Sequence, residues 1–175
     1  MGGVDKALMA FAGRPLLAHV LDRLAPQVAQ VAISARGDPE RFADFAVTVL
    51  DDPPPGGQGP LSGVLAGMIW AAACGARHLA VVPVDGPFVP ADLVARLKGG
   101  EGPRLVLAGG RQHPTFGLWP VDLALSLSAF LASGAPPRMR DFASSAGAEW
   151  VEFPNAAAFD NLNTPQDLDR AGARQ

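Results

Sequence analysis

The sequence predicts an α/β fold: a three-layer, Rossmann-like α/β/α sandwich with a mainly parallel sheet. The first observation is that short β-rich segments alternate with helical segments along the chain. The second is an almost wholly apolar strand over residues 78–84, as expected when both faces of a strand are covered. The length of 175 residues fits one domain, so 1–175 is taken as a single unit.

The first elements are two helices and two strands. Pro15 suits the first turn of a helix, and leucine and valine then recur at helical spacing up to Pro26. Residues 28–34 and 47–50 are β-rich and predict strands. Asp38-Pro39 begins a short helix between them.

The middle of the chain holds a proline- and glycine-rich cluster at 53–57. We interpret this cluster as an active-site loop rather than a domain linker, because it lies between a strand and a helix. Pro60 opens that helix, which runs to about Gly75, and the apolar strand 78–84 follows.

The remaining segments continue the alternation. They are predicted as a helix over 90–97, strands over 104–107 and 115–119, helices over 121–131 and 138–143, a strand over 149–153, and a final helix that Thr164-Pro165 caps and starts.

Composition excludes several classes of protein. Apolar residues make up 49% and charged residues 18%, and the net charge of −3 argues against nucleic acid as the main partner. The single cysteine, Cys74, excludes a disulfide framework and is expected to be a buried structural thiol. The longest apolar stretch, 64–76, is too short to span a bilayer, and no signal peptide is expected. We therefore expect a cytoplasmic protein with no membrane partner.

Carboxylates follow two of the predicted strands. Asp51-Asp52 ends one strand and Asp85 ends another, and in parallel sheets such ends face one crevice. Asp85 suits Mg²⁺, which takes one or two carboxylates plus substrate phosphates; a helix cap or turn is the alternative. Asp52 has the same ambiguity, because Asp-Pro initiates turns.

Glycines provide two candidate anion sites. Gly2 and Gly3 precede Lys6, a pattern in which backbone N–H groups approach a phosphate and an ammonium neutralises it. Residues 59–63 (Gly-Pro-Leu-Ser-Gly) open a helix and offer N–H groups to a ligand, with plain helix initiation as the alternative.

Histidines and amides supply the other candidates. His113 begins a strand near the expected crevice, whereas His19 is predicted to be solvated and His78 structural. Asn163 suits a helix cap, but Asn161 has no capping duty. No Ser-His-Asp arrangement and no zinc spacing is visible.

Taken together, these motifs resemble those of the molybdenum cofactor guanylyltransferases, and the resemblance runs the full chain. The segments that carry it are 1–6, 13–16, 59–63, 83–90 (Pro-Val-Asp-Gly-Pro-Phe-Val-Pro), 113–116 and 159–165. The last two distinguish this family from other nucleotidyltransferases of the same fold.

The resemblance implies a nucleotidyltransferase that moves GMP from GTP to the terminal phosphate of molybdopterin, with Mg²⁺ present and pyrophosphate leaving. GTP and molybdopterin are then the small-molecule partners, and molybdoenzymes or their chaperones the protein partners. The nucleotide residues it implies are Gly2, Gly3, Lys6, Ser34, Asp52 and Asp85. Lys6 and Asp85 would be catalytic, with Asp85 also the metal ligand. Asn161, Asn163 and His113 would face molybdopterin.

Two departures from the family pattern stand out. The base-contact segment reads Ser34-Ala35-Arg36 where an asparagine is expected, so either Ser34 or Arg36 is the guanine contact. Family members also begin with a central strand and an L-A-G-G-x-x-x-R stretch that leads into Met-Gly-Gly. Either translation starts upstream of Met1, which we expect, or this is a damaged, poorly stable version.

Two rival functions are retained. One is a cytidylyl- or sugar-1-phosphate nucleotidyltransferase of the same fold. The other is a non-catalytic module that binds molybdopterin or a partner enzyme without turnover.

Overall fold

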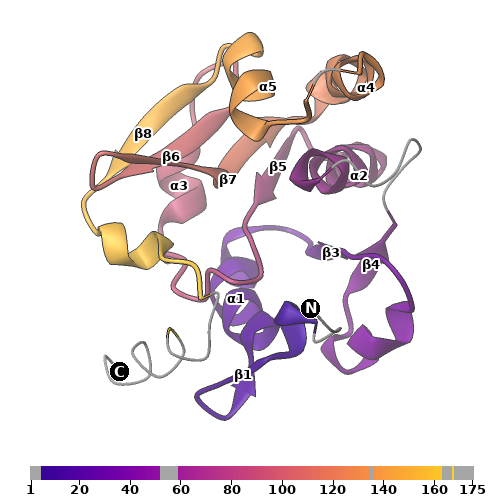
Figure 1. The fold of residues 1–175 in the computed structure, drawn as a ribbon, viewed down its shortest axis with the longest axis vertical. Helices are drawn as coiled ribbons and strands as arrows, with labels where there is room; N and C mark the ends of the chain where they lie inside the picture. Colours follow the sequence, from indigo (N-terminus) through magenta and orange to yellow (C-terminus); the bar gives the residue numbers. More distant parts are fainter. Residues whose placement is uncertain (1–4, 52–58, 135, 163–166, 168–175) are drawn as a thin grey trace.

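The computed structural model describes residues 5–51, 59–134, 136–162 and 167 (Figure 1). Its elements, in chain order, are η1 (Lys6–Leu8), β1 (Ala10–Phe11), β2 (Arg14–Pro15), α1 (Leu16–Leu24), η2 (Ala25–Gln27), β3 (Ala32–Ser34), η3 (Pro39–Phe45), β4 (Thr48–Leu50), α2 (Pro60–Ala73), β5 (His78–Val81), α3 (Leu93–Leu97), β6 (Arg104–Ala108), β7 (Arg111–Pro120), η4 (Val121–Leu123), α4 (Ala124–Ala132), α5 (Met139–Ser145), β8 (Glu149–Phe153) and η5 (Ala156–Phe159).

The main sheet has four strands in the order β5-β7-β6-β8. β7 runs antiparallel to both of its neighbours, and β6 runs parallel to β8. β5, β6 and β8 therefore share one direction, with β7 as the exception to the predicted parallel arrangement. β3 and β4 form a separate parallel pair. The predicted α/β class is confirmed.

Helices cover both faces of the four-stranded sheet, which gives the predicted three layers. Alternate residues of β6 enter different cores, as the pleat of a strand requires. Leu105 packs in the core built with α2, α4 and α5, whereas Val106 and Ala108 pack in the core built with α1 and α3.

A cavity of about 790 Å³, here called the slot, is lined by both β3 and β5. Every residue of both strands lines it, together with Leu17 and Leu21 of α1 and Val64 and Gly67 of α2. β3 is bonded on its other side to β4, and β5 to β7; within the described part of the chain no ladder joins β3 to β5. The family resemblance places the central first strand between the strands predicted over 28–34 and 78–84, and these two strands flank one cavity here. What fills the slot stays a prediction.

Two glycines of α2 hold this helix against both strands. A Cβ at Gly63 would lie 2.7 Å from the Oγ atom of Ser34 in β3, and one at Gly67 would lie 2.7 Å from a methyl of Leu79 in β5. A larger residue at either position would therefore push the Ser34 or Leu79 side chain aside, and glycine lets α2 pack closely on both strands. One turn of α2 thus spans the slot.

The helices begin close to where the sequence places them, but two strands are shorter. The strand predicted over 28–34 is ordered as a ladder only over Ala32–Ser34, and that over 78–84 only over His78–Val81. Residues 28–31 and 82–84 line the slot, and no ladder with another strand of the described residues includes them. The final helix predicted from Thr164-Pro165 lies outside the described residues.

Two predictions about single side chains are wrong. Cys74 is exposed rather than buried, because residues 72–78 at the carboxyl end of α2 and beyond all reach solvent. His19 is partly buried rather than solvated: its Nε2 atom lies 2.8 Å from the carbonyl oxygen of Phe11, and its ring packs edge-on against that phenyl ring. None of the described helices is both long enough and apolar enough to cross a membrane.

Candidate active site

Residues that follow β3 and β5 line the same cavity. Ser34 ends β3, Arg36 comes two residues later, and Asp85 comes four residues after the end of β5. Asn161, far along the chain, lines the cavity with them. The structure therefore brings together the predicted base-side residues, the predicted metal ligand and one predicted molybdopterin residue, as the strand-end rule expects.

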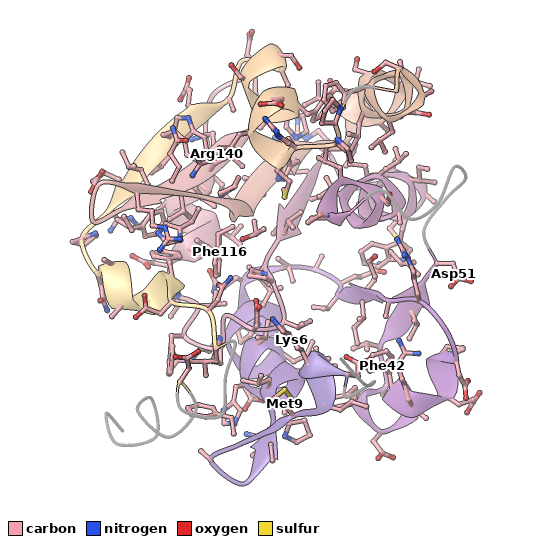
Figure 2. The ribbon with its side chains drawn as sticks, in the orientation of Figure 1. Lys6, Met9, Phe42, Asp51, Phe116 and Arg140 are labelled. Carbon is pink, nitrogen blue, oxygen red and sulfur yellow. The ribbon has the colours of Figure 1, made fainter. Side chains whose placement is uncertain are left out.

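Lys6 lies directly against Asp85. Its Nζ atom donates to the Oδ2 atom of Asp85 over 3.3 Å, across 79 positions of sequence. The lysine side chain is 46% exposed and the aspartate side chain only 14%, so the carboxylate is the inner partner and the ammonium faces solvent. Figure 2 shows Lys6 near the middle of the molecule. The exposed ammonium of Lys6 is suited to bind an anion such as phosphate. The shielded carboxylate of Asp85 is suited to bind a cation that accompanies this anion.

Local structure fixes the backbone of Asp85 on both sides. Gly86 donates to the carbonyl of Pro83, and a Cβ at Gly86 would lie 2.5 Å from the ring of buried Phe116, so only glycine fits there. The carbonyl of Asp85 accepts the N–H of Leu162 over 2.8 Å. This bond places Asn161 beside Asp85, although the two are far apart in sequence.

Lys6 is positioned by a cap that sequence reasoning missed. The Oδ1 atom of Asp5 accepts the N–H of Ala7 over 3.0 Å, which starts η1. The Oδ2 atom of Asp5 accepts the Nε of Arg41 over 2.8 Å. Asp5 stands in the sequence beside Lys6, but no spacing pattern links it to Arg41 in η3.

His113 packs away from the cavity. Its ring contacts Phe116 and Phe159, with centroids 6.3 Å and 5.6 Å away, and it is not among the described residues that line the slot. Burial lowers the pKa of His113 from its usual 6.5, and the charge of Arg111 lowers it further, against smaller opposing effects of a hydrogen bond with the Ala108 backbone and of the charge of Asp160. Burial thus favours the neutral imidazole.

Of the first carboxylate pair, Asp51 does not line the cavity, although Leu50, which ends β4, lines it together with Asp85. Asp51 is exposed and lies at the periphery in Figure 2, well away from Lys6. Gly2, Gly3, Asp52 and Asn163 lie outside the described residues.

Asp85 is the candidate metal ligand. Over the described stretches, no three His, Cys, Asp or Glu side chains gather closely enough to hold a metal ion by themselves. A single carboxylate fits Mg²⁺ that takes its other ligands from nucleotide phosphates and water. It does not fit a dedicated all-protein metal cage.

Comparison with solved structures agrees with this fold. Molybdopterin-guanine dinucleotide biosynthesis protein A from Archaeoglobus fulgidus superposes with a TM-score of 0.74 at 20% identity, over 98% of this chain and 91% of that one. The 2-C-methyl-D-erythritol 4-phosphate cytidylyltransferase from Thermus thermophilus gives 0.68 at 20% identity, over 97% and 93%. At such identities the likeness concerns the fold alone.

Sequence comparison is more specific. Residues 1–148 match the MobA-like NTP transferase domain. A molybdenum cofactor guanylyltransferase from Cereibacter sphaeroides is 56% identical over 173 residues, which are 98% of this chain and 88% of the relative. One from Acidiphilium cryptum (strain JF-5) is 48% identical over 174 residues, 99% of this chain and 88% of the relative. The chain therefore belongs to the molybdenum cofactor guanylyltransferases, nucleotidyltransferases built on the MobA-like NTP transferase domain.

Proposed function

We propose that this protein transfers GMP from GTP to the terminal phosphate of molybdopterin. A phosphate oxygen of molybdopterin bonds to the α-phosphorus of GTP, the bond from that phosphorus to the β-phosphate oxygen breaks, and pyrophosphate leaves with its electron pair. The observation that carries this proposal is the Lys6–Asp85 pair beside the slot, in a chain 56% identical to a named guanylyltransferase.

The chemistry asks for charge neutralisation rather than a proton acceptor. The attacking phosphate oxygen is already anionic, so alignment and electrostatic stabilisation supply most of the catalysis. A site that offers the ammonium of Lys6 and the carboxylate of Asp85 meets this requirement. It also fits a neutral His113 that packs among phenyl rings and needs no catalytic role.

Lys6 and Asp85 would divide the charge between them. The half-exposed ammonium of Lys6 would bind the GTP phosphates, while Asp85 would hold Mg²⁺. Mg²⁺, when bound, would neutralise phosphate charge and polarise the α-phosphate. Lys6 would then exchange its contact with Asp85 for contacts with phosphate oxygens.

The proposed contacts with guanine and molybdopterin are assigned from the residues that line the cavity. Ser34 or Arg36 would contact guanine, because both line the cavity on its β3 side. Asn161 would face molybdopterin on the Asp85 side. Gly2, Gly3 and Asp52 on the nucleotide, and Asn163 and His113 on molybdopterin, remain proposals from the family resemblance, as do molybdoenzymes or their chaperones as protein partners.

The test compares nucleotides by calorimetric titration of this chain with GTP, CTP, UTP and ATP in the presence of Mg²⁺. GTP is expected to bind most tightly. Preference for CTP or UTP would replace the proposal with a cytidylyl- or sugar-1-phosphate transferase. Retention of molybdopterin without binding of any nucleotide would indicate the non-catalytic module.

A further inference from the structure

Arg41 connects two segments of the site that are far apart in sequence. From η3, its guanidinium donates to the Asp5 carboxylate over 2.8 Å and to the carbonyl of Asp38 over 2.6 Å. It also donates to the carbonyl of Arg36. Its planar fork thus reaches three acceptors at once, which the point charge of a lysine does not reproduce.

The guanidinium lies on a rigid base. Its carbon is 4.5 Å from the centroid of the Phe42 ring, and Phe42 is 1% exposed in the core that packs Ala7 with Ile33. Arg41 itself is 26% exposed, so its bonds are partly shielded from water. A partly desolvated cation over an aromatic face is held more firmly than a surface ion pair.

The two segments that Arg41 joins have different parts in the proposed site. Asp5 starts η1 and is followed at once by Lys6, which would bind phosphates. Arg36 follows Ser34 on the side where guanine would lie. The bonds of Arg41 therefore bear on the spacing between the base end and the phosphate end of a bound nucleotide.

Arg41 also neutralises a charge that would oppose binding. The Asp5 carboxylate stands one residue from Lys6, where an uncompensated anion would repel a triphosphate. The 2.8 Å ion pair with Arg41 compensates it. Arg41 therefore combines an electrostatic effect with a geometric one.

We propose that Arg41 is a positioning residue for GTP, acting through Asp5 and the Arg36 carbonyl without touching the nucleotide. The proposal rests on the proposed function, since it assumes that Lys6 and the 34–36 segment hold opposite ends of one nucleotide. It assigns to the loop between β3 and η3 a role in setting the length of the site.

The test separates the two effects with two ligands, GTP and inorganic triphosphate, each titrated against Arg41→Lys and Arg41→Gln. Arg41→Lys keeps the charge beside Asp5 but loses the fork, so its affinity for GTP should fall by up to about tenfold, since the energy of one charge-assisted hydrogen bond limits how much preorganisation of the site is lost. Its affinity for triphosphate should stay unchanged. Arg41→Gln should weaken the binding of both GTP and triphosphate. Adding Asp5→Asn to Arg41→Gln should restore triphosphate binding but not GTP binding.

Arg96 provides a matched control. It also lies over a phenyl ring, with its guanidinium carbon 4.4 Å from the Phe153 centroid, and it also pairs with a carboxylate, Asp92, and donates to a carbonyl, that of Glu152. Arg96→Gln should leave both affinities unchanged. Equal losses for GTP and triphosphate in Arg41→Lys, or wild-type affinity for GTP, would overturn the proposal. If the unmodified chain prefers another nucleotide, the proposed function fails, and the same comparison with that nucleotide still decides the role of Arg41.

Discussion

The slot between β3 and β5 is expected to accept one extended strand. A strand of about five residues rises about 3.3 Å per residue, so it would extend about 16 Å along β3 and β5. The cavity measures about 790 Å³. α1 lies along the slot and leads into β3, as a crossover helix does in a β–α–β unit. The perturbation is therefore to add a strand and a glycine-rich loop ahead of Met1, as the family pattern implies.

The expected stabilisation follows from the walls of the slot. Each apolar side chain buried there contributes about 1.5–3 kcal/mol, and each ladder hydrogen bond about 1 kcal/mol. Ordering one residue costs about 2 kcal/mol. About five residues then give a net gain of about 5 kcal/mol, which for a domain of this size raises the Tm by about 10–20 °C. GMP transfer should rise as well, because the loop adds N–H donors for the triphosphate.

Scanning calorimetry and a GMP transfer assay on the two chains measure these effects. The matched control carries the same extension with aspartate at the centre of the added strand, and it should melt like the shorter chain. If the extended chain matches the shorter one in Tm and turnover, or if the control melts as high as the extended chain, the slot is not a strand site. A Tm that rises with protein concentration in the shorter chain would mean that a second copy fills the slot.

Four further predictions concern single residues. Asp85→Asn should lower guanylyl transfer by about a hundredfold or more with the fold intact, since an amide cannot balance a cation; near-normal turnover at saturating Mg²⁺ would refute the metal assignment. Lys6→Ala should weaken GTP binding by about tenfold to a hundredfold, with Lys6→Arg recovering part, and unchanged affinity in a titration would remove its phosphate role. Asn161→Asp should raise the KM for molybdopterin by repelling its phosphate, and an equal loss of GTP affinity would assign Asn161 to the nucleotide or the fold. Because the pKa of His113 is lowered from 6.5, its stability contribution is present above that pH and is lost as the pH falls through the lower folded-state pKa. The Tm of His113→Gln should therefore fall less with falling pH than the Tm of wild type. A Tm that falls with pH in parallel with wild type would contradict this, and exposed His78→Gln is the control.

The helices and the order of the elements could be predicted because local signals mark them. Pro60 starts α2 and Gly75, with a φ of +75°, follows its end. The β8 strand occupies 149–153 as its β-rich residues indicate. At these positions hydrophobic periodicity, helix caps and turn residues all indicate the same element, and tertiary packing leaves that element unchanged.

The sequence contains a hairpin signal between β6 and β7 that the prediction of the strands did not take into account. Gly109 and Gly110 both have positive φ, 56° and 70°, the conformation of a tight hairpin turn, and β7 begins at once at Arg111. A Gly-Gly pair between two β-rich segments predicts an antiparallel neighbour. The predicted strand start at residue 115 is therefore too late along the chain.

The site was predictable in part. Lys6, Asp85 and Asn161 were singled out from glycine, strand-end and capping patterns, and the structure brings them together. Arg41 was not found, because its partners follow no sequence spacing and its three bonds exist only once η3 packs on the core. The strands predicted over 28–34 and 78–84 are longer than those in the structure. A strand needs a hydrogen-bonded neighbour, and residue propensity does not indicate whether one is present.

The most direct test of the central claim follows label from nucleotides labelled at the α-phosphate in the presence of molybdopterin and Mg²⁺. The extended chain should move label from GTP into a guanine dinucleotide with one pyrophosphate per product, far faster than from CTP, UTP or ATP. The Asp85→Asn variant should form almost none of this product. Faster transfer from another nucleotide, or undiminished GMP transfer by Asp85→Asn, would contradict the account.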